Sequence, residues 1–98
     1  MLVVRDVFQL HFGKTREALA LMREGRAIER RMGYPISRVL VDVTGPYYTL
    51  VNESEFESLS QLEAALGQMG QDAEWRAWYE RFIPLVREGR REVYRIVE

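Results

Sequence analysis

The sequence predicts an α+β protein of βαββαβ order, in which four strands form an antiparallel sheet and two helices cover one of its faces. Two observations lead to this prediction. Segments in which apolar and polar residues alternate, as on a strand, are separated by segments with an apolar residue every third or fourth position, as on a helix. Glycine and proline stand where these segments meet. No linker divides the chain, so we expect one domain over residues 1–98.

The composition is that of a globular protein, and it excludes several classes of partner. Apolar residues make up 47% and charged residues 30%, so a packed core is expected. The net charge is −1 and the arginines are interleaved with glutamates, which disfavours nucleic acid. Early charges leave no apolar segment for a signal peptide or a membrane span. Because the chain has no cysteine and one histidine, we expect a cytoplasmic protein without metal or cofactor.

The first strand is predicted over residues 2–12, and a helix follows it. One side of this strand is apolar and the other is mixed. The apolar side carries Leu2, Val4, Phe8, Leu10 and Phe12, and the mixed side carries Val3, Arg5, Val7, Gln9 and His11. Gly13 ends the strand, Thr15 is expected to cap the helix, and Gly33 with Pro35 is expected to end it.

A pair of antiparallel strands is predicted next. Residues 36–43 alternate, with Ile36, Arg38, Leu40 and Asp42 on one side and Val39, Val41 and Val43 on the other. The turn Thr44-Gly45-Pro46 leads into a third strand at Tyr47-Tyr48-Thr49-Leu50-Val51. An acidic run of Glu53, Glu55 and Glu57 is then expected at the start of the second helix, where the helix dipole favours negative charge.

The second helix is predicted in two pieces, followed by the last strand. Ser58 and Gln61 form a capping box, and Asp72 is placed to cap the second piece. The first piece has a predicted buried stripe of Leu59, Leu62, Leu66 and Met69. The second has an aromatic stripe of Trp75, Trp78, Tyr79 and Phe82 before Pro84. The last strand is expected from Glu92 to Val97.

This order of elements is the ferredoxin-like arrangement, and it leaves one sheet face without helices. Right-handed crossovers place both helices on the same face, so the mixed sides of the strands point away from them. We expect Arg5, Val7, Gln9, His11, Arg38, Leu40, Asp42 and either Tyr47 or Tyr48 there. Because this face is half apolar, an identical subunit is expected to cover it and to close the pair into a barrel.

Nearly the whole chain resembles the dimeric α+β barrel superfamily, and it is most similar to NIPSNAP-like proteins. The matching features are turns, caps and packing positions. They are Arg5, Gly13-Lys14, Gly45-Pro46-Tyr47-Tyr48, Glu55-Phe56-Glu57-Ser58-Leu59, Trp75 and Gly89-Arg90-Arg91-Glu92. The resemblance implies a homodimer formed through the open sheet face and a ligand cavity between helices and sheet. The superfamily includes haem degraders with a histidine on the second helix, and this sequence has none there, so haem is not expected.

Several residues are candidates for a site, each with a structural alternative. His11 is a candidate general base, although a histidine at a strand end is more often hydrogen-bonded and structural. Arg5, Arg38 and Asp42 are candidates to hold an anionic or carbonyl-bearing ligand, or to form an ion pair that fixes dimer register, which we favour. Gln9 and Tyr48 belong to the same ligand-binding set. Trp75 is a candidate to stack on a flat ligand, although an aromatic helical stripe is usually core.

Two functions from different classes follow. The first is a homodimeric small-molecule-binding or interaction protein, with a small apolar or anionic ligand in the cavity between helices and sheet and no partner of nucleic acid or membrane. The alternative is a cofactor-independent monooxygenase or isomerase that acts on a small apolar carbonyl or phenolic substrate. The cavity distinguishes them: an enzyme needs an open pocket that reaches His11, Arg5 or Tyr48, whereas a packed interior leaves only the scaffold role.

Overall fold

The computed structural model describes the backbone of residues 1–98 and every side chain except those of residues 36 and 37. The predicted side of Ile36 therefore lies outside the described side chains. The elements follow the order β1 Leu2–Leu10, α1 Thr15–Met32, β2 Ile36–Val41, β3 Thr49–Phe56, α2 Leu59–Gln71, α3 Ala73–Phe82, a short 3₁₀ turn Ile83–Leu85, and β4 Val86–Arg95.

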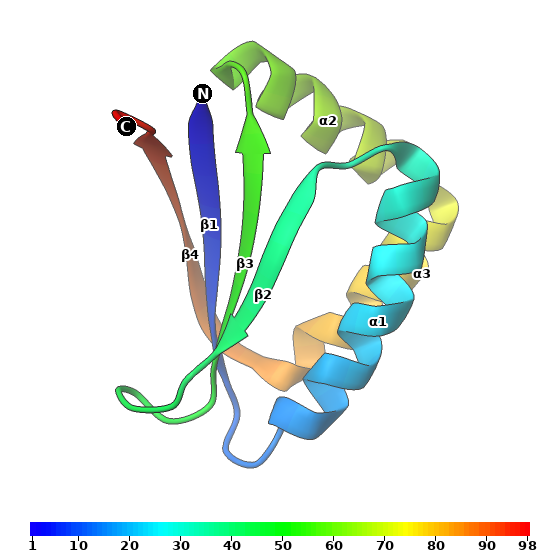
Figure 1. Ribbon diagram of the computed structural model, residues 1–98. Coiled ribbons are helices and arrows are strands. Elements are labelled where there is room, and N and C mark those ends of the chain that lie inside the picture. The colour runs from blue at the N-terminus through cyan, green and yellow to red at the C-terminus, as the bar shows by residue number, and fades with distance from the viewer.

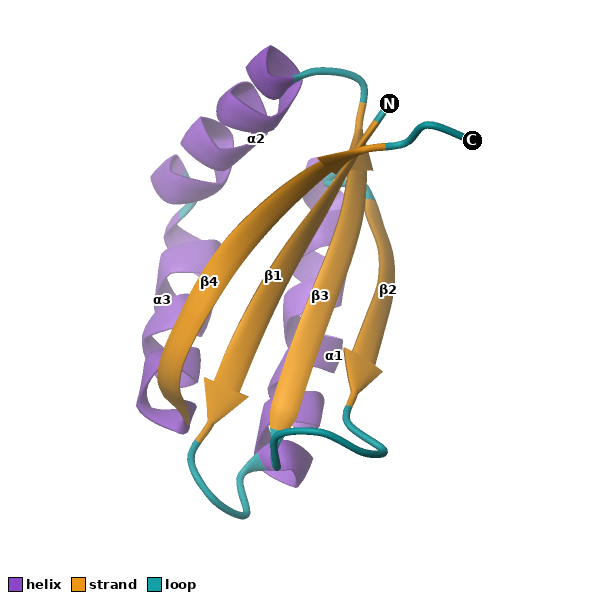
Figure 2. Ribbon diagram, turned by 90° about the vertical axis from the view of Figure 1, so that its left-hand side faces the viewer, coloured by secondary structure: helices purple, strands orange, loops and turns teal.

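The four strands form one antiparallel sheet in the order β2-β3-β1-β4. The three helices all lie against the same face, and the opposite face is bare (Figures 1 and 2). This confirms the predicted ferredoxin-like arrangement, including the second helix in two pieces. None of the described helices combines the length with the apolar character that a membrane span needs.

The strand registers decide which side chains point toward the helices. Phe8 meets Phe82 of α3 edge to face, with ring centroids 5.0 Å apart, and Val4 and Leu10 are buried on the same side of β1. The alternate residues of β1 therefore point to the bare face, as predicted. We call this side the open face, and its central residues are Arg5, Val7, Gln9, Arg38, Leu40, Val51 and Glu53.

The boundaries of α1 agree with the sequence prediction at one end only. Gly33 ends the helix in the left-handed conformation, at φ 72° and ψ 22°, where a residue without Cβ is favoured. At the start, the helix begins at Thr15 itself and the flanking residue is Lys14, with no side-chain hydrogen bond to the cap. The prediction that Thr15 caps the helix is therefore wrong.

The caps of α2 and α3 are those predicted. The hydroxyl of Ser58 accepts a hydrogen bond from the Gln61 amide at 3.1 Å, and the Asp72 carboxylate accepts one from the Trp75 amide at 2.9 Å. The Gln61 side chain accepts in return from the amide of Glu57, not from that of Ser58.

The buried stripe predicted for α2 is wrong at its first position. Leu59 is 63% exposed. It opens the helix at its very start, before the turn that packs on the sheet, and burial begins with Leu62. Leu62 and Met69 supply the buried contacts of this helix.

The strands β3 and β4 differ most from their predicted bounds. The strand β3 extends to Phe56, so Glu53 and Glu55 lie in a strand and the prediction that they start a helix is wrong. Tyr48 stands just before β3 with φ 60°, a backbone conformation that cannot continue a strand. β4 begins at Val86, not at Glu92, because it pairs along almost the whole length of β1.

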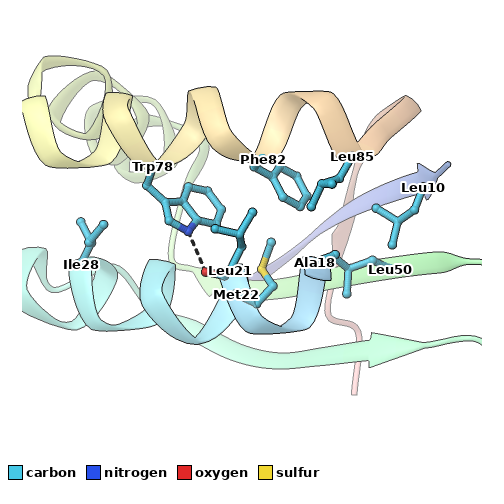
Figure 3. Close-up of a cluster of buried hydrophobic side chains, with 9 residues drawn as sticks. All are labelled: Leu10, Ala18, Leu21, Met22, Ile28, Leu50, Trp78, Phe82 and Leu85. Carbon is cyan, nitrogen blue, oxygen red and sulfur yellow. Dashed lines mark hydrogen bonds between the residues drawn. The ribbon is translucent and has the colours of Figure 1, made fainter. Parts of the chain in front are cut away.

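The main core lies between α1, α3 and one end of the sheet (Figure 3). Its buried members are Leu10, Ala18, Leu21, Met22, Ile28, Leu50, Trp78, Phe82 and Leu85. The Trp78 ring stacks on Phe82 with centroids 5.3 Å apart, and its indole N–H donates a hydrogen bond to the Leu21 carbonyl at 2.6 Å. The bond crosses from α3 to α1, as the dashed line in Figure 3 shows.

The approach of α3 to α1 requires glycine at position 25. A Cβ atom at Gly25 would lie 2.8 Å from two carbons of the Trp78 ring, closer than real contacts allow. The ring has no room to retreat, because it is hydrogen-bonded on one side and stacked on the other. The closeness of the two helices therefore depends on the missing side chain.

We expect Gly25→Ala to destabilise the protein by about 1–3 kcal/mol, the usual cost of overpacking. The matched control is Gly67→Ala in α2, where a Cβ meets nothing within 4 Å. That change should stabilise the helix by up to about 1 kcal/mol, because alanine loses less backbone entropy than glycine. Urea unfolding measures both, and equal effects of the two substitutions would contradict the account of the helix contact.

Candidate functional site: a cavity between the sheet and the helices

A cavity of about 850 Å³ lies between the helix-covered face of the sheet and the three helices. Its lining comes from β1, β3 and β4 below and from all three helices above. This volume falls in the range that proteins use to enclose small organic ligands. The predicted cavity between helices and sheet is therefore present.

One wall of the cavity is apolar and aromatic. Trp75 stacks on Trp78 with ring centroids 4.7 Å apart and lies 6.3 Å from the Tyr79 ring. Trp78 is buried in the core, but Trp75 is only half-buried and Tyr79 is exposed. The outer two rings therefore present accessible flat surface to the cavity, a wall suited to a flat apolar molecule.

The floor of the cavity is a polar row across three strands. Asp6 on β1 stands opposite Asn52 on β3 and opposite Arg91 on β4. The Arg91 guanidinium donates to the Asp6 carboxylate, with Nε and Oδ1 2.6 Å apart. The Oδ1 atom of Asn52 is buried and has no hydrogen-bond partner among the described residues. Such an orphaned acceptor is costly unless something else satisfies it.

The polar row divides the core into two parts. On one side lies the main core, and on the other a smaller cluster of Val4, Phe56 and Leu62. Asp6 lies between Val4 and Phe8 on β1, so the polar row stands at the gap between the clusters. A core built for stability alone would be apolar here.

The C-terminal cap of α1 places Tyr34 beside this row. Because Gly33 turns the chain in the left-handed conformation, the amide of Tyr34 reaches back and donates to the Glu29 carbonyl at 2.8 Å. The Tyr34 ring then packs edge-on against Phe56, with centroids 5.5 Å apart. Burial raises the pKa of the Tyr34 hydroxyl, partly offset by its hydrogen bond to Ser54, so this hydroxyl keeps its proton at neutral pH.

Glu29 is the unusual residue of the cavity. It lines the cavity from α1 and is 4% exposed, and its carboxyl group has no hydrogen bond or ion pair among the described residues. Burial raises the pKa of this carboxyl to about 7; the charge of Arg26 opposes the shift and that of Asp6 adds to it. Glu29 is therefore protonated in about half of the molecules near neutral pH.

Of the ligand-binding residues predicted from the sequence, only Trp75 lines the cavity. Arg5 and Arg38 lie on the open face, where both pair with the buried Glu53, at 3.0 and 2.6 Å. The acid that joins the two arginines is thus Glu53 and not Asp42. The Asp42 carboxylate instead accepts a hydrogen bond from the Thr49 amide at 2.9 Å, which closes the turn between β2 and β3.

The other predicted residues also lie away from the cavity. Gln9 is on the open face and reaches the carbonyl oxygens of Tyr47 and Tyr48. Tyr48 packs against the main core and touches Phe12, with ring centroids 4.5 Å apart. His11, the predicted base, follows β1 as an exposed residue, and its backbone amide donates to the Leu85 carbonyl at 2.9 Å.

The sequence did contain a signal for the cavity residues. Asp6 and Asn52 occupy strand positions that point toward the helices, and Glu29 follows Ile28 on the buried stripe of α1. A polar residue at a core-facing position is a rule violation that often marks function. Among the described residues, no group of three or more acidic or histidine side chains is arranged to hold a metal ion.

No protein-family model and no curated protein matches the sequence, whereas solved structures match the fold closely. A NIPSNAP family protein from Agrobacterium tumefaciens matches with a TM-score of 0.89 and 23% identity, over 95% of this chain and 90% of that protein. An uncharacterised NIPSNAP domain protein from Burkholderia xenovorans matches with a TM-score of 0.91 and 16% identity, over 99% and 95%. An antibiotic biosynthesis monooxygenase matches with a TM-score of 0.75 and 19% identity over both whole chains. The chain therefore has the fold of the NIPSNAP proteins, which confirms the resemblance as one of fold.

Glu29 should make stability depend on pH. Its pKa is about 7 in the folded protein against an ordinary value of 4.5, so folding favours the protonated form. Stability then falls as the pH rises from 4.5 to about 7 and is level above that, a loss of up to roughly 3 kcal/mol. Glu29→Gln should remove this loss and be more stable than the native protein at about pH 8, but not below pH 4.5.

Urea unfolding at both pH values measures the difference, and Glu63→Gln, an exposed change in α2, is the control. A Glu29→Gln variant whose advantage does not grow with pH would show that Glu29 is not a desolvated acid.

Proposed function

We propose that this protein is a homodimer that binds a small, flat and largely apolar molecule in the cavity between the sheet and the helices. The observation that carries the proposal is the combination of an aromatic wall with a polar floor in one cavity of about 850 Å³. Pockets for organic ligands typically pair apolar walls with a few convergent polar groups. Stacking on Trp75 and Tyr79 would orient the ligand, and the polar row of the floor would meet its polar group.

The two tryptophans of the chain both line this cavity, so their fluorescence reports on its contents. Native mass spectrometry of protein purified from its own host should show a retained molecule, and removing that molecule should change the tryptophan emission. Gly70→Phe should narrow the cavity, since Gly70 lines it and has free space around its Cβ position. Affinity for the recovered molecule should fall at least about tenfold, or 1.4 kcal/mol.

Gly67→Phe is the matched control, because Gly67 has equal free space on the same helix but does not line the cavity. If both phenylalanines weaken binding alike, the ligand does not lie in this cavity.

The open face supports the dimer part of the proposal. Val7 and Val51 lie at its centre and are each 8% exposed, and Leu40 on the edge strand β2 is 37% exposed. The charges beside this centre are compensated, because Glu53 pairs with both Arg5 and Arg38. A face with paired charges and an apolar centre can be buried by the same face of a second copy without leaving an isolated charge. In this arrangement the two arginines would fix the register of the dimer.

Leu40→Arg should therefore break the dimer. The added charge would lie in the proposed interface and weaken dimerisation by at least about tenfold, which sedimentation over a dilution series measures. Leu59→Arg is the control, because Leu59 is exposed on α2 on the other side of the molecule. If the native protein is monomeric even at the highest concentration of the dilution series, the dimer proposal is wrong.

A cofactor-independent monooxygenase or isomerase acting on an apolar carbonyl or phenolic substrate is the second candidate function. The buried, titratable carboxyl of Glu29 favours it, since a purely binding cavity has no need of a group that changes protonation near pH 7. The shared fold with an antibiotic biosynthesis monooxygenase also supports it. The cytoplasmic location predicted from the sequence stays a prediction.

A further inference from the structure

We propose that Glu29 is the catalytic base of the cavity, and that it removes a proton from the carbon beside the carbonyl group of a flat, apolar ketone. This inference rests on the proposed binding function, because it requires that such a molecule enters the cavity. It adds a substrate class, a residue and a chemical step.

Glu29 differs from the other carboxylates of the cavity in being both buried and without a hydrogen bond or ion pair among the described residues. The Asp6 carboxylate forms an ion pair with Arg91, with Oδ1 and Nε 2.6 Å apart. Glu80 also lines the cavity but is exposed to water. Among the described residues that line the cavity, Glu29 is thus the one acid that is both buried and unpaired. It remains available to a bound molecule.

The electrostatic surroundings keep Glu29 near the protonation state that a base needs. A base works best when its pKa lies close to the working pH, because it is then both deprotonated and strong. Burial brings the pKa of Glu29 to about 7, well above that of a carboxylate in water. The ionisable groups around Glu29 are Arg26 on the same helix and, lining the cavity from other segments, Asp6, Tyr34, Arg76, Tyr79, Glu80, Arg90 and Arg91.

The step is balanced without any oxidant. The C–H bond beside the carbonyl breaks, its proton goes to a carboxylate oxygen of Glu29, and its electron pair forms a carbon–carbon double bond. The carbonyl π electrons move onto oxygen and give an enolate. Glu29 then returns the proton, either to the same carbon or, in a β,γ-unsaturated ketone, to the γ carbon at the far end of the double bond. The second outcome is an isomerisation.

The polar floor supplies donors for the negative oxygen of the enolate. The Tyr34 hydroxyl stays protonated, because burial raises its pKa, and Arg91 carries a fixed positive charge. Tyr34 is tied to Glu29 through the helix cap, so donor and base keep their relative positions. Donors held in place before the reaction stabilise such a charge better than water does.

The test follows exchange of the acidic carbon-bound protons of β-tetralone, a flat apolar ketone, with solvent deuterium by proton NMR. The native protein should accelerate the exchange, with a rate that rises with pH through about 7 as Glu29 loses its proton. Glu29→Gln should lower the acceleration by roughly 10²–10⁴-fold, the usual contribution of a general base. Glu24→Gln, an exposed change on the same helix, should leave it intact.

Quenching of tryptophan fluorescence by β-tetralone is measured in parallel and separates the two proposals. Binding that Glu29→Gln preserves, together with lost exchange, supports the base. Binding by the native protein without accelerated exchange, or exchange that Glu29→Gln does not reduce, overturns the base and leaves the binding function standing. Absence of any quenching in the native protein counts against the binding function itself.

Discussion

The close approach of α3 to α1 at Trp78 and Gly25 is the constraint on which the rest of the structure depends. The indole ring occupies the space that a side chain at position 25 would fill, and its N–H bonds the Leu21 carbonyl across the gap. This contact closes the helix layer over one end of the sheet. α2 precedes α3, is separated from it by a break at Asp72, and covers the other end of the sheet with a separate, smaller core. The cavity lies where these two cores do not meet.

The polar residues that line the cavity between the two cores lower the stability of the fold, which indicates that they are kept for function. A protein of 98 residues buries a limited apolar area and has little stability to spare. It nevertheless keeps an unpaired carboxyl at Glu29 and an orphaned acceptor at Asn52 in the layer that should be most apolar. Natural proteins retain such groups mainly at sites where activity requires them. The aromatic wall beside them provides the apolar part of the same site.

The two faces of the sheet differ in how their polar groups are paired. On the open face the charges are compensated, since Glu53 pairs with Arg5 and Arg38, although the buried Nε of Arg5 has no hydrogen-bond partner among the described residues. On the covered face Asp6 and Arg91 pair, while the Glu29 carboxyl has no ion pair among the described residues. A face whose charges are paired suits a contact between subunits, and a cavity with an unpaired buried carboxyl suits a ligand.

Local sequence patterns were enough to predict the features that depend on near neighbours: the order of elements, the sides of β1, the caps at Ser58 and Asp72, and the end of α1 at Gly33. Tertiary structure decided the extent of β3 and β4, because strand pairing overrode a weak local pattern. Tertiary structure also determined which residues come together in the cavity. Its four polar residues stand far apart in the chain, at Asp6, Glu29, Asn52 and Arg91. Only strand register and the packing of α1 bring them together, and local periodicity carries no information about either.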